Sequence, residues 1–209
     1  MKKFRVPDDV SAICFDIDNT LYRNERYALS QAELLLDRLG QEKGWDRSRV
    51  DLELAQVKEI TKKEQSQGNW FRMLGIPIAV SVEWREALLH PEEFLAVDPQ
   101  LDRALSNLGR FTLCALTNNP SSIGMRTLRS LGISERFSFI VGLDDTGFSK
   151  PSPEPFAEVE RRLAIPAEEI VIVGDRFDVD LAVPLERGWG GVLVESMADV
   201  YALPDLFPG

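Results

Sequence analysis

The 209-residue chain has little of what several protein classes require. Two cysteines, Cys14 and Cys114, and one histidine, His90, offer too few sulfur and nitrogen ligands for a typical structural zinc site. Both cysteines lie inside apolar runs, so we interpret them as buried side chains of a protein in a reducing compartment. The single histidine also disfavours a Ser-His-Asp hydrolase, and we interpret it as a surface or hinge residue.

Long apolar runs and an excess of positive charge are also absent. No apolar run approaches the roughly 18 residues of a membrane-spanning helix, and the opening segment MKKFRVPDDV lacks the apolar stretch of a secretory signal. We therefore expect a cytoplasmic protein. The formal net charge is −10 at pH 7, which disfavours nucleic-acid polymers and anionic membranes as partners, because both bind cationic surfaces. A small anionic substrate would then need local positive charge, such as a metal ion. The sequence carries no signal for an oligomeric state.

Five short apolar runs predict strands that are buried on both faces, because the runs are nearly continuous rather than alternating. These runs are Ala12–Phe15, Phe111–Leu116, Phe137–Val141, Ile170–Val173 and Gly191–Val194. Helices are predicted between the last four, at Ser121–Leu131, Pro155–Leu163 and Asp178–Arg187. Pro184 fits the last of these helices only if it lies in the first turn. The alternation predicts an α/β fold with a parallel sheet and helices on both faces.

The stretch from about residue 24 to residue 94 interrupts this alternation. It contains no convincing strand, and its apolar residues recur at helical spacing. One such stripe is Val50, Leu54, Val57 and Ile60. Residues 58–64 are mostly charged and are expected to form a solvated helix face. Because about 70 residues are too many for an ordinary connection, we expect an all-helical domain inserted after the first strand.

Two acidic side chains, Asp16 and Asp18, follow the first predicted strand. Residues two apart on a strand point to the same face, and open α/β sheets bind ligands at the carboxyl ends of their strands. Two close carboxylates repel each other and favour a shared proton or a bound cation. Mg²⁺ would suit such a site because it prefers oxygen ligands. The alternative is that this Asp-Xaa-Asp segment only caps a turn.

Polar residues also follow the next three predicted strands. Thr117 and Asn118 follow the second strand, where a hydroxyl and free backbone N–H groups at a helix start can bind an anion. Lys150 follows the third strand and could neutralise a phosphoryl oxygen. Asp175 and Asp180 belong to a segment after the fourth strand that has three acids within six residues. Each group alone could be a helix cap or a solvated charge, but their recurrence at one sheet edge favours a single ligand site.

Together these segments resemble the four motifs of the haloacid dehalogenase-like (HAD) hydrolase superfamily. The matching segments are DIDNT, LTNN, SKPSPEPF and GDRFDVD, in that order. The resemblance covers essentially the whole chain and implies a Rossmann-like, doubly wound parallel sheet with strand order 3-2-1-4-5. It also implies a core domain of residues 1–23 and 95–209 and a helical cap domain of residues 24–94. The extended segment DIDNTLY is similar to pyrimidine 5′-nucleotidase-type members.

The resemblance implies a Mg²⁺-dependent phosphatase that acts on a small phosphorylated metabolite, such as a nucleotide or a sugar phosphate. Asp16 would be the nucleophile that forms an aspartyl-phosphate. Asp18 would protonate the leaving alkoxide and then accept a proton from the hydrolytic water. The carboxylates of Asp16 and Asp175 and the backbone carbonyl of Asp18 would bind the metal.

The remaining motif residues would act on the transferring phosphoryl group. Thr117 and Lys150, which we count among the catalytic residues, would hold its oxygens together with the backbone N–H of Asn118. Asp180 would support the site by orienting Lys150 or by binding a metal-bound water, and it fits the family spacing better than Asp178.

Several alternatives remain open at this point. Dehalogenase members lack an acid at the position of Asp18, because a halide leaves without a proton, so Asp18 implies an oxygen leaving group. A phosphomutase of the same superfamily and a non-catalytic phosphorylation switch similar to receiver domains both remain possible. The cluster of Trp70, Phe71 and Arg72 in the insert would either contact substrate or pack inside the helical domain.

Overall fold

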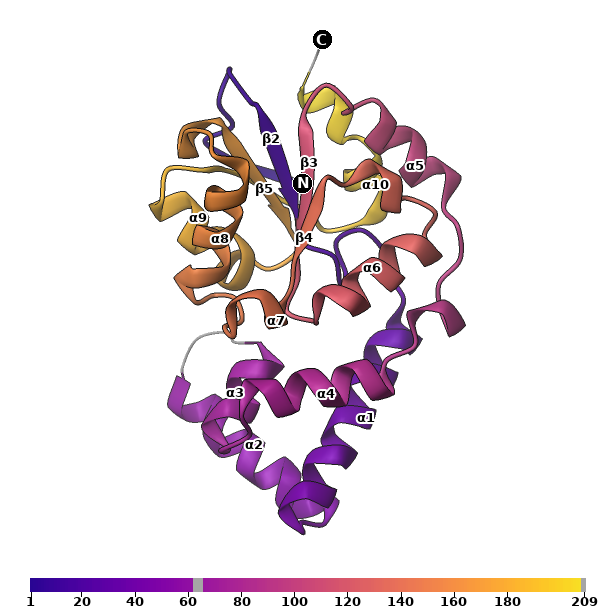
Figure 1. Ribbon diagram of the computed structural model, residues 1–209, viewed down its shortest axis with the longest axis vertical. Helices are drawn as coiled ribbons and strands as arrows, with labels where there is room; N and C mark the ends of the chain where they lie inside the picture. Colours follow the sequence, from indigo (N-terminus) through magenta and orange to yellow (C-terminus); the bar gives the residue numbers. More distant parts are fainter. Residues whose placement is uncertain (62–65, 208–209) are drawn as a thin grey trace.

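The computed structural model describes residues 1–61 and 66–207 and shows two parts (Figure 1). A sheet flanked by helices forms one part, and helices inserted after the second strand form the other. No helix in the described ranges is long and apolar enough to cross a membrane.

The sheet has six strands, of which five are parallel. In chain order they are β1 (Lys2–Phe4), β2 (Ala12–Phe15), β3 (Thr112–Leu116), β4 (Phe139–Val141), β5 (Ile170–Gly174) and β6 (Gly190–Leu193). The spatial order is β1-β6-β5-β2-β3-β4, and β1 pairs with β6 in the antiparallel sense. The α/β class and the order of the five predicted strands are confirmed. Strand β1 was not predicted, because it is a short edge strand with two lysines and lacks a buried apolar run.

Helices cover both faces of the sheet because successive side chains of each strand point to opposite faces. They are α5 (Pro99–Ser106), α6 (Ser121–Ser130), α7 (Leu143–Thr146), α8 (Pro153–Leu163), α9 (Ala182–Glu186) and α10 (Met197–Tyr201). Helices α5, α6 and α10 pack with Ile13 and Phe15 of β2, whereas α8 and α9 pack with Cys14. Cys14 and Cys114 are free and buried, so their prediction as buried side chains is confirmed.

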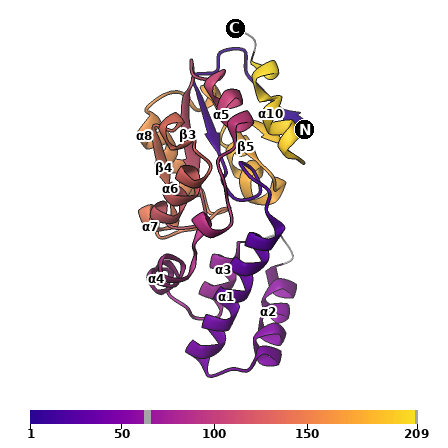
Figure 2. The same ribbon diagram turned by 90° about the vertical axis from the view of Figure 1, so that its right-hand side faces the viewer.

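The insert is a separate group of helices with its own apolar core. It consists of α1 (Glu25–Lys43), α2 (Arg47–Thr61), α3 (Gln67–Met73) and α4 (Ile78–Leu88), and contains no strand within its described residues. Its core residues are Leu35, Leu39, Val50, Leu54, Phe71, Ile76 and Trp84. Figure 2 shows these helices on the side of the sheet away from the two chain termini. This arrangement supports the division into residues 1–23 plus 95–209 and residues 24–94, which stays a prediction.

Two local expectations for the insert have different outcomes. Val50, Leu54 and Val57 are buried as predicted, but Ile60 is 69% exposed. The prediction for Ile60 was wrong, because it lies in the last turn of α2 and outside the core of the insert. The expected charged face at residues 58–64 falls partly on residues 62–65, which lie outside the described residues.

The segment after β5 departs from a single regular helix. Residues Phe177–Leu181 form a π-helical turn, and α9 follows directly at Ala182. Pro184 therefore lies in the first turn of α9, where a missing N–H breaks no helical hydrogen bond. The π-helical turn places Asp180 beneath the end of β5, where the candidate site lies.

Candidate active site

The parallel sheet brings the predicted site residues together. Strand β2 lies between β3 and β5, and Phe15 pairs in register with Ala115 and Val173. The residues that follow these strands, Asp16 and Thr117 among them, therefore emerge at one edge of the sheet. The backbone hydrogen bonds of the sheet continue one residue past the end of β2, where the Asp16 N–H donates to the Val173 carbonyl of β5 at 2.9 Å. The rigid centre of the sheet thus fixes the backbone of the candidate site.

Lys150 is completely buried at this edge. Its Nζ donates to Asp16 Oδ1 at 2.6 Å, to Asp180 Oδ1 at 2.7 Å and to the Leu116 carbonyl at 3.0 Å. Burial alone would lower the pKa of Lys150, but the two carboxylates raise it above its ordinary value. Lys150 therefore stays a cation at neutral pH, and the possibility of a solvated surface lysine is excluded.

Asn118 fixes the backbone of Lys150 from the neighbouring loop. The Lys150 N–H donates to Asn118 Oδ1 at 2.7 Å. In the loop that carries Asn118, the Asn119 N–H donates to Thr117 Oγ1 at 3.1 Å. The loops after β3 and before α8 are therefore joined at the site, and the structure brings Thr117, Asn118 and Lys150 to one place.

Asp180 is buried, whereas Asp178 is exposed. Asp180 Oδ2 accepts from the Arg176 N–H at 3.1 Å, and Oδ1 accepts from Lys150. The carboxylate approaches the backbone of Gly174 so closely that a Cβ built there would lie 2.5 Å from Asp180 Cβ. Glycine at 174 is thus what allows Asp180 to reach the lysine.

We expect Gly174→Ala to destabilise the protein by about 3 kcal/mol and to lower its activity, because the added methyl group displaces Asp180 from Lys150. Thermal unfolding measures the change in stability. The matched control is Gly191→Ala, since its Cβ would meet Leu181 Cδ2, the end of a flexible side chain, at 3.3 Å. Equal losses of stability in the two variants would contradict this account.

Three carboxylates form a cluster beside the lysine. One oxygen each from Asp16, Asp175 and Asp180 lies within 4.8 Å of the others. Burial, opposed by Lys150 and reinforced by Asp180 and Asp175, raises the pKa of Asp16 to about 7. Burial, reinforced by Asp180, raises the pKa of Asp175 to about 6. Asp175 Oδ1 is buried without a hydrogen-bond partner among the residues that the structure describes.

This donor set fits a divalent cation such as Mg²⁺. A hard cation takes carboxylate oxygens, and it would occupy Asp175 Oδ1, which has only a 3.8 Å ion pair with Arg176 Nε and no hydrogen bond from the described residues. The cluster contains the two carboxylates expected as ligands, Asp16 and Asp175, together with Asp180. The expected ligand from Asp18 was its backbone carbonyl, and that contact stays a prediction.

The side chain of Asp18 instead faces a network of neutral hydrogen-bonding groups. Its Oδ1 accepts from the Tyr22 hydroxyl at 2.5 Å, and its Oδ2 accepts from Asn119 Nδ2 at 3.0 Å and from Thr117 Oγ1 at 3.4 Å. Gln31 Nε2 of the insert lies 3.5 Å from Oδ1. Tyr22, Asn119 and Gln31 were not predicted as site residues. The available signal was that Tyr22 lies two residues after the DIDNT segment and that Asn119 is the last residue of the LTNN segment, whereas Gln31 had no such signal.

A cavity of about 360 Å³ lies between the sheet edge and the insert. Its walls include Asp18, Asn118, Asn119 and Arg176 from one side and Gln31, Trp70 and Arg85 from the other. The three residues of the Trp70-Phe71-Arg72 cluster lie in different places. Trp70 lines this cavity, Phe71 is buried in the core of the insert, and the guanidinium of Arg72 lies over the ring of Phe148. The Ser66 and Ser149 hydroxyls, 2.7 Å apart, join the insert to the loop that carries Lys150.

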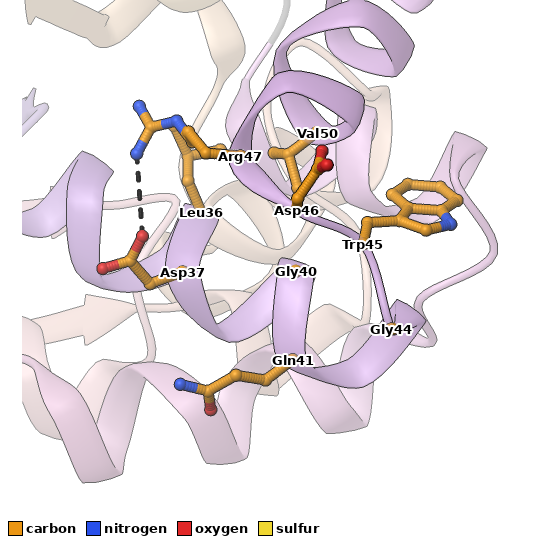
Figure 3. A pocket seen from close by; sticks show the side chains of 9 residues that line it. All are labelled: Leu36, Asp37, Gly40, Gln41, Gly44, Trp45, Asp46, Arg47 and Val50. Carbon is orange, nitrogen blue, oxygen red and sulfur yellow. Dashed lines mark ion pairs between the residues drawn. The ribbon is translucent and has the colours of Figure 1, made fainter.

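A second cavity, of about 530 Å³, lies within the insert between α1 and α2 (Figure 3). Arg47, one of its lining residues, forms an ion pair with Asp37 at 3.6 Å, drawn in Figure 3, and a second one with Asp51 at 3.0 Å. The charge of Arg47 is thus compensated within the insert. None of the predicted site residues lines this cavity, so the candidate active site is the one at the sheet edge.

The model of the haloacid dehalogenase-like hydrolase family matches residues 10–183. A glyceraldehyde 3-phosphate phosphatase from Methanopyrus kandleri is 30% identical over 184 residues, which are 82% of this chain and 78% of the relative. A phosphoglycolate phosphatase from Salmonella typhi is 39% identical over 109 residues, 46% of this chain and 43% of the relative. The crystal structure of a HAD phosphatase from Thermococcus onnurineus has the same fold, with a TM-score of 0.66 at 22% identity over 96% of this chain and 99% of that one. The chain belongs to the haloacid dehalogenase-like hydrolase family.

Proposed function

We propose that the chain is a Mg²⁺-dependent phosphatase that hydrolyses a small phosphomonoester through an aspartyl-phosphate on Asp16. Membership of the family and relatives named as phosphatases support a phosphoric monoester hydrolase. The observation that carries the finer proposal is the arrangement around Asp16. Its carboxylate accepts from the buried Lys150 and lies in a cluster with Asp175, whose buried Oδ1 accepts no hydrogen bond from the described residues.

The metal would be held by the carboxylates of Asp16 and Asp175 and by the backbone carbonyl of Asp18. When bound, it would neutralise negative charge on the carboxylates and on the phosphoryl oxygens. The chain holds these groups ready, because Thr20 Oγ1 donates to Asp16 Oδ2 at 2.8 Å and Lys150 donates to Oδ1. Hydrogen bonds to both oxygens therefore fix the orientation of the Asp16 carboxylate before a substrate binds.

The reaction proceeds in two displacements at phosphorus. In the first, an Asp16 oxygen bonds to phosphorus, the ester P–O bond breaks, and Asp18 gives its proton to the leaving oxygen. In the second, Asp18 takes a proton from water as the water oxygen bonds to phosphorus, and the bond between phosphorus and Asp16 breaks. Thr117, Asn118 and Lys150 hold the phosphoryl oxygens throughout, which is the electrostatic positioning that phosphoryl transfer requires.

The size of the cavity supports a small metabolite as substrate. At about 360 Å³ it lies near the lower end of ordinary ligand pockets. Glyceraldehyde 3-phosphate and phosphoglycolate, which the names of the two relatives carry, are small phosphomonoesters, as is a sugar phosphate.

The direct test is release of inorganic phosphate from a panel of phosphomonoesters and from p-nitrophenyl phosphate, with Mg²⁺ and with a chelator. We expect turnover with Mg²⁺ and its loss with the chelator. Transfer of phosphate to a second sugar hydroxyl, without net release, would identify the phosphomutase alternative. A phosphorylated protein that never releases phosphate would identify the receiver-like switch.

The raised pKa values of Asp16 and Asp175 predict how pH affects metal binding. Both folded-state values, about 7 and about 6, lie above the ordinary carboxyl value, so ionisation of these groups opposes folding as pH rises through this range. Mg²⁺ binds the ionised forms and protons compete with it. We therefore expect Mg²⁺ to raise the melting temperature more at about pH 8 than at about pH 5.5.

Thermal unfolding at a fixed Mg²⁺ concentration measures this difference. Asp175→Asn is the comparison variant, because it removes one expected ligand and one of the two titrating groups, and its Mg²⁺-dependent shift should be small at both pH values. An equal shift of the unchanged protein at both pH values would contradict the proposed ligand set.

A further inference from the structure

Arg85 lies in α4 of the insert and lines the cavity above Asp18. Only 3% of its surface is exposed. Its Nη1 donates to the Ser81 carbonyl at 3.1 Å and to the Ser81 hydroxyl, and its guanidinium carbon lies 5.8 Å from the centre of the Phe71 ring. The Nε atom is buried and has no hydrogen-bond partner within residues 1–61 and 66–207. A buried arginine with an unfilled donor is costly, so this arrangement needs an explanation.

The negative charges near Arg85 compensate it only from a distance. Arg85 forms no ion pair with a carboxylate in the described part of the chain, and its Nε donates to no acceptor there. Glu86, next to it on α4, directs its carboxylate to the Ser122 hydroxyl of α6 at 2.6 Å. Burial lowers the pKa of Arg85 to about 10, and the Asp18 carboxylate opposes this decrease. Arg85 is thus a cation at neutral pH that faces a cavity.

The donors of Arg85 without a hydrogen-bond partner lie on the Nε–Nη2 side of the guanidinium, the side on which arginine binds a carboxylate through two parallel hydrogen bonds. Nη1 is occupied by Ser81, while Nε and Nη2 have no hydrogen-bond partner in the described ranges. Other arginines of this chain use the same two atoms on a carboxylate. Arg161 Nε and Nη2 donate to Glu158 at 2.8 and 2.7 Å, and those of Arg136 donate to Asp102 at 2.7 and 3.1 Å. Two parallel N–H groups match the two oxygens of a carboxylate.

A second unfilled donor lies on the same cavity wall. Trp70 lines the cavity, and its Nε1 is buried without a hydrogen-bond partner among the described residues. The opposite wall carries Asp18 and Asn118, which we place at the phosphoryl group. A ligand with its phosphoryl group at Asn118 and an oxyanion at Arg85 would therefore contact the cavity from both the sheet edge and the insert.

We propose that the Nε–Nη2 edge of Arg85 binds a carboxylate of the substrate, and that the substrates are phosphate esters of small hydroxy acids. This inference rests on the proposed phosphatase activity. It assigns Arg85 as the residue that determines specificity and Trp70 Nε1 as an additional donor. Bidentate binding of a carboxylate by a desolvated guanidinium discriminates strongly against a neutral group, because the neutral group leaves the charge unpaired.

The test compares three esters of equal length that end in a carboxylate, a carboxamide or a hydroxymethyl group: phosphoglycolate, phosphoglycolamide and 2-hydroxyethyl phosphate. We expect kcat/KM of the unchanged enzyme to be at least about 30-fold higher for the carboxylate than for either neutral ester. In Arg85→Met this ratio should fall to about 1 or below. The matched control is Arg38→Met, which removes another arginine of the insert that lies over Trp84 and does not line the cavity. Its ratio should stay as in the unchanged enzyme.

The outcomes separate this inference from the proposed function. If no ester and no p-nitrophenyl phosphate is hydrolysed, the proposed function is wrong. If esters are hydrolysed without preference for the carboxylate, or if Arg85→Met lowers kcat/KM equally for all three, only the role of Arg85 is wrong. If Arg85→Met does not fold, the selectivity of the unchanged enzyme still tests the substrate class, and Arg85→Lys, which keeps the charge but loses the two parallel N–H groups, tests the role of Arg85 by a fall in the same ratio. Trp70→Phe, which removes only the N–H donor, should lower the ratio by a smaller factor.

Discussion

Replacing Asp16 with asparagine is expected to abolish turnover, with a loss in kcat of about 10⁴-fold or more. An amide oxygen is a poor nucleophile toward phosphorus, so the first displacement does not occur. The fold should survive the change. Asp180 still pairs with Lys150, and the amide oxygen can still accept a hydrogen bond from the lysine or from Thr20. Release of inorganic phosphate from p-nitrophenyl phosphate with Mg²⁺ measures the loss.

The matched control for this change is Asp178→Asn, which alters an exposed acid in the segment after β5. It removes one negative charge near the site without touching the carboxylate cluster, so its activity should stay within about 2-fold of the unchanged enzyme. Thermal unfolding of both variants shows whether they are folded. Substantial activity in folded Asp16→Asn would mean that another residue is the nucleophile.

The sequence was sufficient to predict that Asp16, Thr117, Lys150 and Asp175 would meet at one edge. The reason is topological: parallel strands with short crossovers bring their carboxyl ends together, whatever the loops contain. Strand β1 escaped prediction because an edge strand made of Lys2, Lys3 and Phe4 has no apolar pattern. The buried apolar runs were therefore sufficient to predict the five parallel strands of the core, but not the edge strand β1.

Other parts of the site depend on how the insert docks, and sequence spacing does not encode that contact. Arg85 lies in a helix whose pattern shows only that one side packs inside the insert. Gln31 likewise lies in α1, far along the chain from Asn119, yet the two side chains approach within 3.4 Å. The sequence also did not predict the complete burial of Lys150, because a lysine in a loop is ordinarily solvated. The contacts of Arg85 and Gln31 thus arise where the insert meets the sheet edge, whereas Lys150 is buried by the core residues Asp16, Leu116 and Asp180.

Replacing Asp18 with asparagine is expected to slow turnover by about 10²- to 10⁴-fold and to leave the enzyme phosphorylated. The hydrogen bonds around the site can persist, because an amide oxygen still accepts from Asn119 Nδ2 and the amide nitrogen can donate to the Tyr22 hydroxyl. What is lost is the proton that Asp18 gives to the leaving oxygen and later takes from water. The two displacements depend on that proton to different degrees, which makes the variant informative.

The leaving group separates the two steps. p-Nitrophenolate leaves without protonation, so Asp18→Asn should still form the aspartyl-phosphate from p-nitrophenyl phosphate and then stall, giving a burst of about one p-nitrophenol per enzyme. An alkyl phosphate needs the proton in both steps, so its turnover should fall further and show no burst. Acid quenching should trap phosphate on the protein in the first case only. Tyr22→Phe, which keeps the Asp18 carboxylate but removes its hydroxyl donor, should reduce both rates by about 10-fold without a burst. Equal losses for aryl and alkyl esters in Asp18→Asn would show that Asp18 orients the site and does not transfer the proton.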